Sequence, residues 1–259
     1  MTPQVLLSFD VEEFDMPFEY DFAISKEAQM NVGKAGLDAV MPLIDQHQVS
    51  TTLFTTANFA AHYPAAIQKL AINHEIASHT YYHSTFKNEH LLESRILLEK
   101  ISGKAVTGLR MPRMRPVEMA EVIKAGYTYD SSINPTWIPG KYNNLHLPRT
   151  VYQDQGMTRI PASVSPVFRI PLFWLSFKNF PYPIFKKLTL DTLKKDGYLC
   201  LYFHPWEFVD ISSYGVPAFT RRKCGQPLLD QLDLLITDLK KIGVGFSTIQ
   251  EFLNKRLPF

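Results

Sequence analysis

Two kinds of hydrophobic pattern alternate along this chain, one typical of strands and one typical of helices. Short runs rich in β-branched and aromatic residues predict buried strands at residues 5–11, 51–56, 76–79, 108–111, 127–132, 159–162, 198–204 and 245–249. Between many of them, hydrophobic residues recur every three or four positions, which predicts amphipathic helices at residues 35–48, 90–101, 116–125, 184–195 and 228–242. Alternating strands and helices are typical of a parallel α/β fold.

One segment departs from this alternation. Residues 132–179 are rich in proline, asparagine and aromatic residues, which predicts long loops over one face of the molecule. No internal repeat or linker composition interrupts the rest. We therefore expect one α/β domain over residues 1–259, folded as an irregular (β/α)7-type barrel. In the helix at 90–101, the spacing favours a buried stripe of Leu92, Ile96 and Leu97.

Composition and charge exclude several classes of protein. Hydrophobic residues at 46% and charged residues at 20% fit a soluble globular protein, and the net charge of +2 with no Lys/Arg run gives no reason to expect nucleic acid. Cys200 and Cys224 form no CxxC pair, so we expect buried thiols and no disulfide framework. No apolar stretch reaches the ~18 residues of a transmembrane helix, and the N-terminus lacks the features of a signal peptide. These features favour a cytoplasmic protein.

Titratable side chains follow three of the predicted strands. Asp10 and Glu12 end the first strand, His79 and His83 follow the third, and His204 ends the seventh. Two imidazoles four residues apart can share one face of a helical turn, at the spacing that a metal needs. One carboxylate completes a three-ligand site with room for water, and the spare carboxylate and histidine supply a base and an acid. This inventory predicts metal-assisted hydrolysis.

These side chains share a position relative to their strands. In parallel α/β barrels the chemistry gathers where strands end and loops begin. Six candidate residues lie at such strand ends: Asp10, Glu12, His79, Arg110, Asp130 and His204. We therefore expect them to converge on one site.

Ordered motifs then suggest a family. Residues 9–12 read Phe-Asp-Val-Glu, residues 79–83 read His-Thr-Tyr-Tyr-His, and residues 109–112 read Leu-Arg-Met-Pro. They are followed by Gly-Tyr-Thr-Tyr-Asp-Ser-Ser at 126–132 and His-Pro-Trp-Glu at 204–207. In this order, and over nearly the whole chain, the sequence resembles the polysaccharide deacetylases of the NodB-homology type, carbohydrate esterase family 4.

The resemblance implies a metal and its ligands. In that family the first motif opens with a base aspartate, here Asp10, and soon gives a metal carboxylate. Glu12 points to the same side of a strand as Asp10, so we expect Glu12 to bind the metal, with Glu13 as the second candidate. His79 and His83 would supply the imidazole ligands. The expected cofactor is a divalent transition metal, most often Zn²⁺.

The resemblance also implies the remaining roles. Arg110 would pair with the base and keep it ionised and oriented. The backbone N–H of Arg113 would stabilise the tetrahedral oxyanion together with the metal. His204, as an imidazolium, would give a proton to the leaving sugar amine, with Asp130 orienting it. Trp206 would form an apolar wall near the acetyl methyl group.

The expected substrate is an N-acetylated sugar of a surface polysaccharide or its precursor, such as an O-antigen or capsule precursor that is lipid- or nucleotide-linked. Arg113 and Arg115, in the loop after the third motif, favour an anionic substrate. N- and O-deacetylation share the same tetrahedral chemistry, so both stay open. Two alternatives remain: a metal-independent hydrolase of a non-sugar amide, and a sugar-binding pseudoenzyme.

An aromatic-rich segment has two interpretations. Aromatic residues interleaved with lysines occupy residues 168–187. They fit core packing, or else a sugar-stacking lid or a surface for lipid-linked glycan at the membrane interface.

Overall fold

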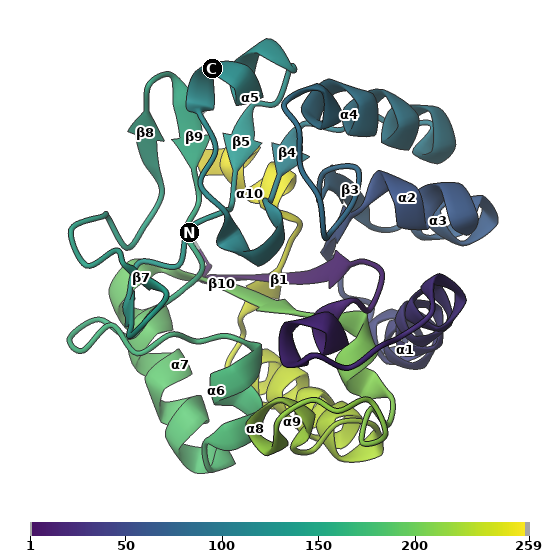
Figure 1. Cartoon of the computed structure of the whole chain (residues 1–259). Coiled ribbons are helices and arrows are strands. Elements are labelled where there is room, and N and C mark those ends of the chain that lie inside the picture. Colours follow the sequence, from purple (N-terminus) through teal and green to yellow (C-terminus); the bar gives the residue numbers. More distant parts are fainter. Residues whose placement is uncertain (1, 257–259) are drawn as a thin grey trace.

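Eight strands lie where the hydrophobic pattern predicts them. In the computed structural model, which describes residues 2–256, a curled parallel sheet is surrounded by helices (Figure 1). The eight strands are β1 (Gln4–Val11), β2 (Thr52–Thr55), β3 (Glu75–Ser78), β4 (Gly108–Leu109), β5 (Tyr129–Asp130), β9 (Met157–Arg159), β10 (Tyr198–Phe203) and β11 (Gly245–Phe246).

The strand order follows the chain around a barrel. The order is β10-β1-β2-β3-β4-β5-β9-β8, with β11 beside β1, and every pair is parallel except β8 (Tyr152–Asp154) with β9. Just after β9, the amide of Ser163 donates to the carbonyl of Cys200 in β10 at 2.9 Å, and the Cys200 amide donates to the Ser163 hydroxyl. These bonds bring the two ends of the curled sheet together. The fold is the predicted α/β arrangement of an irregular (β/α)7-type barrel.

Alternation along β1 separates two hydrophobic clusters. Val5, Leu7 and Phe9 belong to the outer cluster, which lies between the sheet and the helices. Leu6 points the other way, into an inner cluster that helix α10 (Ile249–Arg256) completes with Phe252. Both faces of the strand are therefore buried, which explains its nearly continuous apolar sequence.

The other helices cover the outside of the sheet, with α1, α4, α7 and α9 clearly arranged around it (Figure 1). Their bounds are α1 (Lys26–Gln46), α2 (Ala57–His62), α3 (Pro64–Leu70), α4 (Glu89–Ser102), α5 (Met119–Lys124), α6 (Trp174–Asn179), α7 (Tyr182–Asp196), α8 (Ala218–Arg221) and α9 (Gln226–Lys241). Three 3-10 helices are η1 (Met16–Tyr20), η2 (Pro112–Met114) and η3 (Pro205–Phe208). Within the described residues, none of the helices combines the length and apolar character needed to span a bilayer.

The predicted burial of α4 was wrong. Leu92 and Ile96 are 43% and 53% exposed, whereas Leu91 and Leu98 are buried. Two apolar rows run along this helix, one with Leu91 and Leu98 and the other with Leu92 and Ile96. The spacing of the hydrophobic residues does not decide which row faces the sheet. Packing selects the row that also carries Ser94, whose hydroxyl bonds to the buried Ser78 of β3.

The segment expected to consist of long loops contains short elements. It holds the hairpin β6 (Trp137–Ile138) and β7 (Tyr142–Asn143), the pair β8–β9, and helix α6. Most aromatic residues of the segment 168–187 are core residues, since Phe173, Trp174, Phe177 and Phe185 are buried. Core packing is therefore the better interpretation of this segment, with Phe168 as an exposed exception.

Candidate metal centre and active site

Residues of the predicted metal site lie at the carboxyl ends of β1 and β3. Glu12 directly follows β1, and His79 directly follows β3. His79 and His83 do not share a helical turn, contrary to the prediction. They flank a loop in which Thr80 has a left-handed φ of 61°, a conformation that cannot continue a right-handed helix. The loop nevertheless stacks their rings, with centroids 5.7 Å apart.

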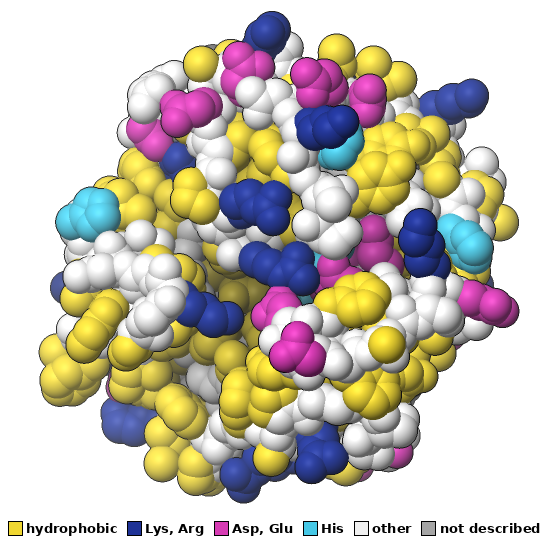
Figure 2. Space-filling view, viewed as in Figure 1, with side chains coloured by type: hydrophobic (Ala, Val, Ile, Leu, Met, Phe, Trp, Pro, Cys, Tyr) yellow, Lys and Arg dark blue, Asp and Glu magenta, His cyan; other side chains and the backbone are white. Residues whose placement is uncertain are grey.

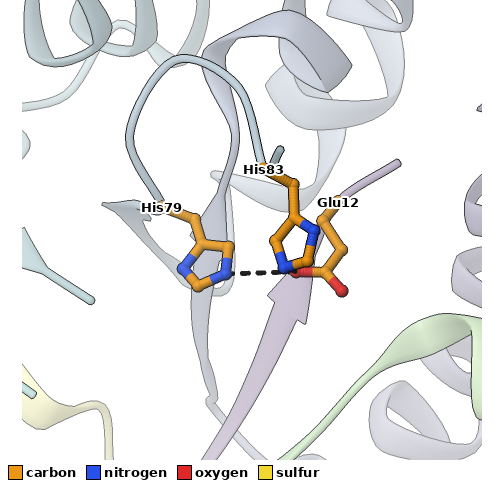
Figure 3. A group of neighbouring side chains, drawn as sticks. All are labelled: Glu12, His79 and His83. Carbon is orange, nitrogen blue, oxygen red and sulfur yellow. Dashed lines mark ion pairs between the residues drawn. The ribbon is translucent and has the colours of Figure 1, made fainter. Parts of the chain in front are cut away.

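Glu12, His79 and His83 point toward one another (Figure 3). Oε2 of Glu12 lies 3.1 Å from Nε2 of His79 and 3.1 Å from Nε2 of His83. One ligand atom from each residue lies within 4.8 Å of the others, and all three residues are buried.

The hydrogen bonds around this group show that it fits a cation. Nδ1 of His79 lies 2.7 Å from the carbonyl oxygen of Arg110, and Nδ1 of His83 lies 2.6 Å from a carboxylate oxygen of Asp15. In the neutral rings the Nδ1 atoms therefore carry the protons, and both Nε2 lone pairs face Glu12. Oε2 of Glu12 is buried and has no hydrogen-bond partner among the described residues. A divalent metal between these three atoms would satisfy all of them.

Glu12 and Glu13, the two alternatives for the carboxylate, have different partners. Oε1 of Glu12 accepts a hydrogen bond from the indole N–H of Trp206 at 3.1 Å, which leaves Oε2 facing the imidazoles. Glu13 instead accepts bonds from Thr56, at 2.6 Å, and from the backbone N–H of His83, at 3.2 Å. Glu13 therefore anchors the histidine loop, and Glu12 is the carboxylate in the cluster.

The imidazoles also influence the charge of Glu12. Burial on its own would raise the pKa of Glu12, but His83, His79 and His204 outweigh burial and hold this pKa far below its usual value. Burial would lower the pKa of His83, whereas Glu12 and Asp15 raise it above the usual histidine value. In the metal-free site, negative charge on Glu12 and a proton on His83 thus stabilise each other.

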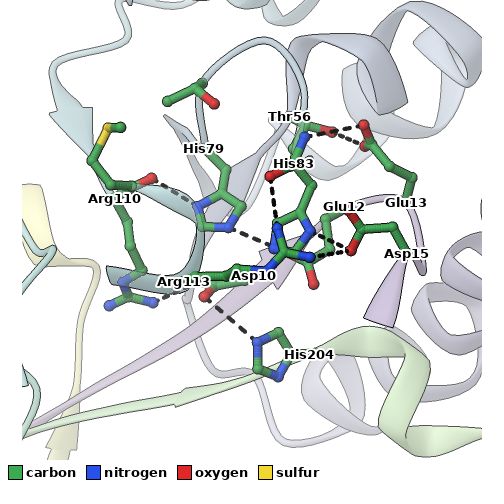
Figure 4. A network of polar contacts seen from close by, with 12 residues as sticks. Asp10, Glu12, Glu13, Asp15, Thr56, His79, His83, Arg110, Arg113 and His204 are labelled. Atoms are coloured by element: carbon green, nitrogen blue, oxygen red, sulfur yellow. Dashed lines mark hydrogen bonds and ion pairs between the residues drawn. The ribbon is translucent and has the colours of Figure 1, made fainter. Parts of the chain in front are cut away.

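Asp10 and Arg110 form a buried ion pair beside this cluster (Figure 4). Nη1 of Arg110 lies 2.7 Å from Oδ1 of Asp10 and also donates to the Ser8 hydroxyl. The guanidinium is fully buried, donates to Ser131 and lies 4.0 Å from the ring centroid of Phe54. The contact expected between Asp10 and Arg110 is present, and it fixes the orientation of the carboxylate.

His204 approaches Asp10 from β10. Its Nε2 lies 3.9 Å from Oδ2 of Asp10, and its Nδ1 lies 3.1 Å from Oε1 of Glu207. The ring stacks on Trp206 with centroids 4.8 Å apart and meets Trp174 edge-on at 5.0 Å. Burial alone would lower the pKa of His204, yet the hydrogen bond to Glu207 and the nearby carboxylates raise it.

The orienting role expected of Asp130 was wrong. Asp130 pairs with Nε of Arg159 at 2.9 Å and accepts the backbone N–H of Ser132, and Glu207 is the carboxylate at His204. Asp130 ends β5 beside β9, so the neighbouring strand supplies its partner. The sequence contains a signal for Glu207. His204 directly precedes η3, and a glutamate three residues after such a position has the capping-box spacing.

The structure gives Arg113 and Trp206 contacts that the sequence did not predict. The Arg113 side chain pairs with Asp15 at 3.0 Å and with Glu19 at 2.6 Å, so it is already engaged by two carboxylates. It therefore holds Asp15 against His83, and this pairing gives no support to binding of an anionic substrate by Arg113. Trp206 is buried and holds Glu12 through its indole N–H.

Comparison with known proteins points to a family for the part of the chain that carries this site. Residues 5–129 match the family model described as polysaccharide deacetylase, and this range includes Asp10, Arg110 and the three residues of the metal cluster. Over these residues, just under half of the chain, the protein is similar to polysaccharide deacetylases. Proteins of that family are hydrolases that deacetylate carbohydrates.

Solved structures of low sequence identity share the fold of the whole chain. A probable polysaccharide deacetylase from Pseudomonas aeruginosa PAO1 is 16% identical, with a TM-score of 0.69 over 99% of this chain and 92% of that one. A peptidoglycan N-acetylglucosamine deacetylase is 17% identical, with a TM-score of 0.54 over 96% and 86%. An allantoinase is 15% identical, with a TM-score of 0.66 over 99% and 91%. No curated protein gives a significant match.

The surface of the molecule is hollowed near the middle of one face. Figure 2 shows Lys and Arg side chains beside this hollow, with apolar side chains lining part of it. His83 and His204 are 7% and 9% exposed, whereas His79 is 1% exposed, so after Arg113 these two rings are the least deeply buried parts of the site.

Proposed function

We propose that this protein is a metal-dependent hydrolase that removes an N-acetyl group from a sugar of a surface polysaccharide, or from its lipid- or nucleotide-linked precursor. The observation that carries the proposal is the buried Oε2 of Glu12, which has no hydrogen-bond partner among the described residues and faces the Nε2 atoms of two imidazoles within a polysaccharide deacetylase fold. A neighbouring structure acts on peptidoglycan N-acetylglucosamine, which supports an N-acetylated sugar as the substrate class.

Glu12, His79 and His83 would hold the metal, with Zn²⁺ favoured by a set of two imidazoles and one carboxylate. When bound, such an ion polarises the acetyl carbonyl and lowers the pKa of water. The groups behind the two imidazoles suit this role, because Asp15 and the Arg110 carbonyl fix the tautomers and orientations of both histidines.

Asp10 would act as the general base. Its carboxylate lies next to the metal cluster and is held by Arg110 through Oδ1, which leaves Oδ2 directed toward His204. An ionised carboxylate in this position takes a proton from the attacking water as the carbonyl carbon becomes tetrahedral.

His204 would act as the general acid. Glu207 and the other nearby carboxylates favour its protonated form, and its Nε2 is directed toward Asp10. Donation from Nε2 converts the leaving nitrogen into a neutral amine, without which the C–N bond breaks slowly. The backbone N–H of Arg113 would stabilise the oxyanion, and Trp206 would border the acetyl methyl group.

Acetate release tests the proposal. We expect the zinc-loaded protein to release acetate from N-acetylglucosamine oligomers or from an N-acetylated sugar nucleotide. Asp10→Asn and His204→Gln should each lower the rate by about 10²–10⁴-fold. Glu19→Gln is the matched control, because Glu19 contacts Arg113 outside the cluster and its variant should retain activity.

Other results would select the alternatives. Binding of these sugars without acetate release would indicate a pseudoenzyme. Hydrolysis of a non-sugar amide that persists after complete metal removal would indicate a metal-independent amidohydrolase.

A further inference from the structure

A buried ammonium group lies on the far side of Glu207 from His204. Lys178, in α6, is fully buried, and its Nζ lies 2.7 Å from Oε2 of Glu207. The same Nζ donates to the carbonyl of Thr220 at 2.8 Å and lies 3.4 Å from Sγ of Cys224. A carboxylate oxygen, a carbonyl oxygen and a thiol sulfur thus surround the buried Nζ of Lys178.

Glu207 connects this ammonium to the imidazole. Oε1 accepts the backbone N–H of His204 at 2.8 Å and faces its Nδ1 at 3.1 Å, while Oε2 faces Lys178. Burial would raise the pKa of Glu207, but Lys178 and His204 lower it below the usual value. Without the ammonium, a fully buried carboxylate would tend to take up a proton and lose its hold on the imidazole.

The ring of His204 has few other constraints on its orientation. Trp206 stacks on one face, and Trp174 meets the ring edge-on. These contacts fix the plane of the ring, but both flipped positions of the imidazole satisfy them. Among the contacts of the described residues, the short one to Glu207 at 3.1 Å distinguishes Nδ1 from Nε2 and so directs Nε2 toward Asp10, which lies 3.9 Å away.

We propose that Lys178 is a positioning residue for His204: it holds Glu207 ionised and in place, so that Glu207 keeps a proton on Nδ1 and directs Nε2 into the active site. The inference rests on the proposed function, in which His204 gives the Nε2 proton to the leaving amine. Lys178 acts on the charge of His204 through Glu207, with which it forms an ion pair. Its Nζ also lies 5.0 Å and 5.8 Å from the ring centroids of Trp174 and Trp206, which pack on His204.

A purely structural ion pair would behave differently. The charged and titratable groups near His204 are Asp10, Glu12 and Glu207, with Tyr202 beside the ring. Lys178 faces Glu207 and Cys224. If the pair only joined α6 to η3, removing Lys178 would lower stability and leave the titration of His204 unchanged.

The test compares Lys178→Met with wild type in two measurements. Nuclear magnetic resonance of ¹⁵N-labelled histidine gives the pKa and tautomer of His204. Kinetics of acetate release give the pH profile of kcat/KM. In K178M we expect the pKa of His204 to fall by about one unit or more, because the charge of Glu207 is lost. The alkaline limb of the kcat/KM profile should move to lower pH by the same amount. The value of kcat should fall about tenfold or more, with KM little changed.

Two further variants provide rescue and control. Lys178→Arg keeps the charge but has a planar fork in place of three tetrahedral donors. In this variant the pKa of His204 should lie close to the wild-type value, and kcat should lie between those of K178M and wild type. Lys187→Met is the matched control, because Lys187 is exposed and its ion pair within the described residues is with Asp191 on the surface of α7. It should titrate and turn over like wild type.

An unchanged His204 pKa in folded K178M would overturn the inference, as would a neutral Nε2–H tautomer of His204 in the wild type. If K178M does not fold, the double variant K178M/E207Q removes both charges, which a buried site tolerates better. It should show the same lowered pKa, and an unshifted pKa in it would contradict the proposal. The resonance data need no substrate, so they test Lys178 even if the protein releases no acetate.

Discussion

The partner of each Nδ1 atom determines what each imidazole can do. The Nδ1 atoms of His79 and His83 face a backbone carbonyl and Asp15, which directs two Nε2 lone pairs at Glu12. Nδ1 of His204 faces Glu207, and its Nε2 is directed at Asp10. Lone pairs that converge on a carboxylate suit a metal ligand, and a ring beside several carboxylates suits an acid.

A variant of Asp15 tests whether its hydrogen bond to His83 strengthens metal binding. In Asp15→Asn the neutral amide holds the Nδ1 proton of His83 more weakly, so we expect zinc affinity to fall about 10–100-fold. Competition with a chromophoric chelator measures this change. Glu19→Gln, which also loses a partner of Arg113, should bind zinc like wild type. Equal affinities in D15N and wild type would show that His83 needs no such support.

The guanidinium of Arg110 provides a test of stability. Arg110→Met leaves Asp10 buried without its counter-charge, so we expect a loss of about 3–5 kcal/mol in the free energy of unfolding. Urea denaturation of the metal-free protein measures the loss. The double variant Arg110→Met/Asp10→Asn should recover much of it, because no unpaired charge remains. A single variant as stable as wild type would contradict this account of the pair.

At the scale of elements, the site depends on how closely α1 approaches η3. Gly36 of α1 lies so near η3 that an added Cβ would come within 2.0 Å of the Pro205 carbonyl oxygen and 2.7 Å of the Trp206 amide nitrogen. Both obstacles are backbone atoms, so they cannot rotate away. The absence of a side chain at Gly36 thus lets η3 hold Trp206 against Glu12 and Glu207 against His204.

Gly36→Ala should therefore move η3 and weaken the site. We expect a loss of about 1–3 kcal/mol in stability, as is typical of overpacking, together with slower acetate release. Thermal unfolding and the acetate assay measure the two effects. Ala35→Ser, at an exposed neighbouring position on the same helix, should change neither. If G36A matched wild type in both assays, the close contact would be unimportant.

Strand ends could be predicted from the sequence better than the loops that follow them. An apolar run that stops at Asp10 or His204 marks the end of a buried strand, and parallel strands end at one rim of a barrel. The direction of the next loop depends on contacts that are distant in sequence. The bond of Asp130 to Arg159 and the pairing of Lys178 with Glu207 join elements that no local pattern relates.

At the scale of the whole molecule, the barrel interior contains more than one polar layer. Below the active site, Glu75 is buried and accepts bonds from Thr52 and Tyr129, at 2.7 Å each, and from the backbone N–H of Gln250 in α10. This carboxylate joins strands β2, β3 and β5 to the helix that closes the bottom of the barrel. Burial outweighs the hydrogen bonds and raises its pKa above the usual 4.5.

The raised pKa of Glu75 predicts a dependence of stability on pH. The folded protein holds this proton more tightly than the unfolded chain, so the contribution is fully present below about pH 4.5 and is lost as pH rises through the folded-state pKa. Glu75→Gln lacks this loss, so its stability relative to wild type should increase between pH 4 and pH 7. Urea midpoints at the two pH values measure it. A constant difference would show that Glu75 does not titrate in this range.

The account as a whole requires that Glu12, His79 and His83 hold a divalent metal. Elemental analysis of the protein after loading with zinc and dialysis tests this requirement most directly, beside Glu12→Ala and His79→Ala variants treated identically. We expect near-stoichiometric zinc in the wild type and little in either variant. A folded wild-type protein that stays free of metal after loading would contradict the account.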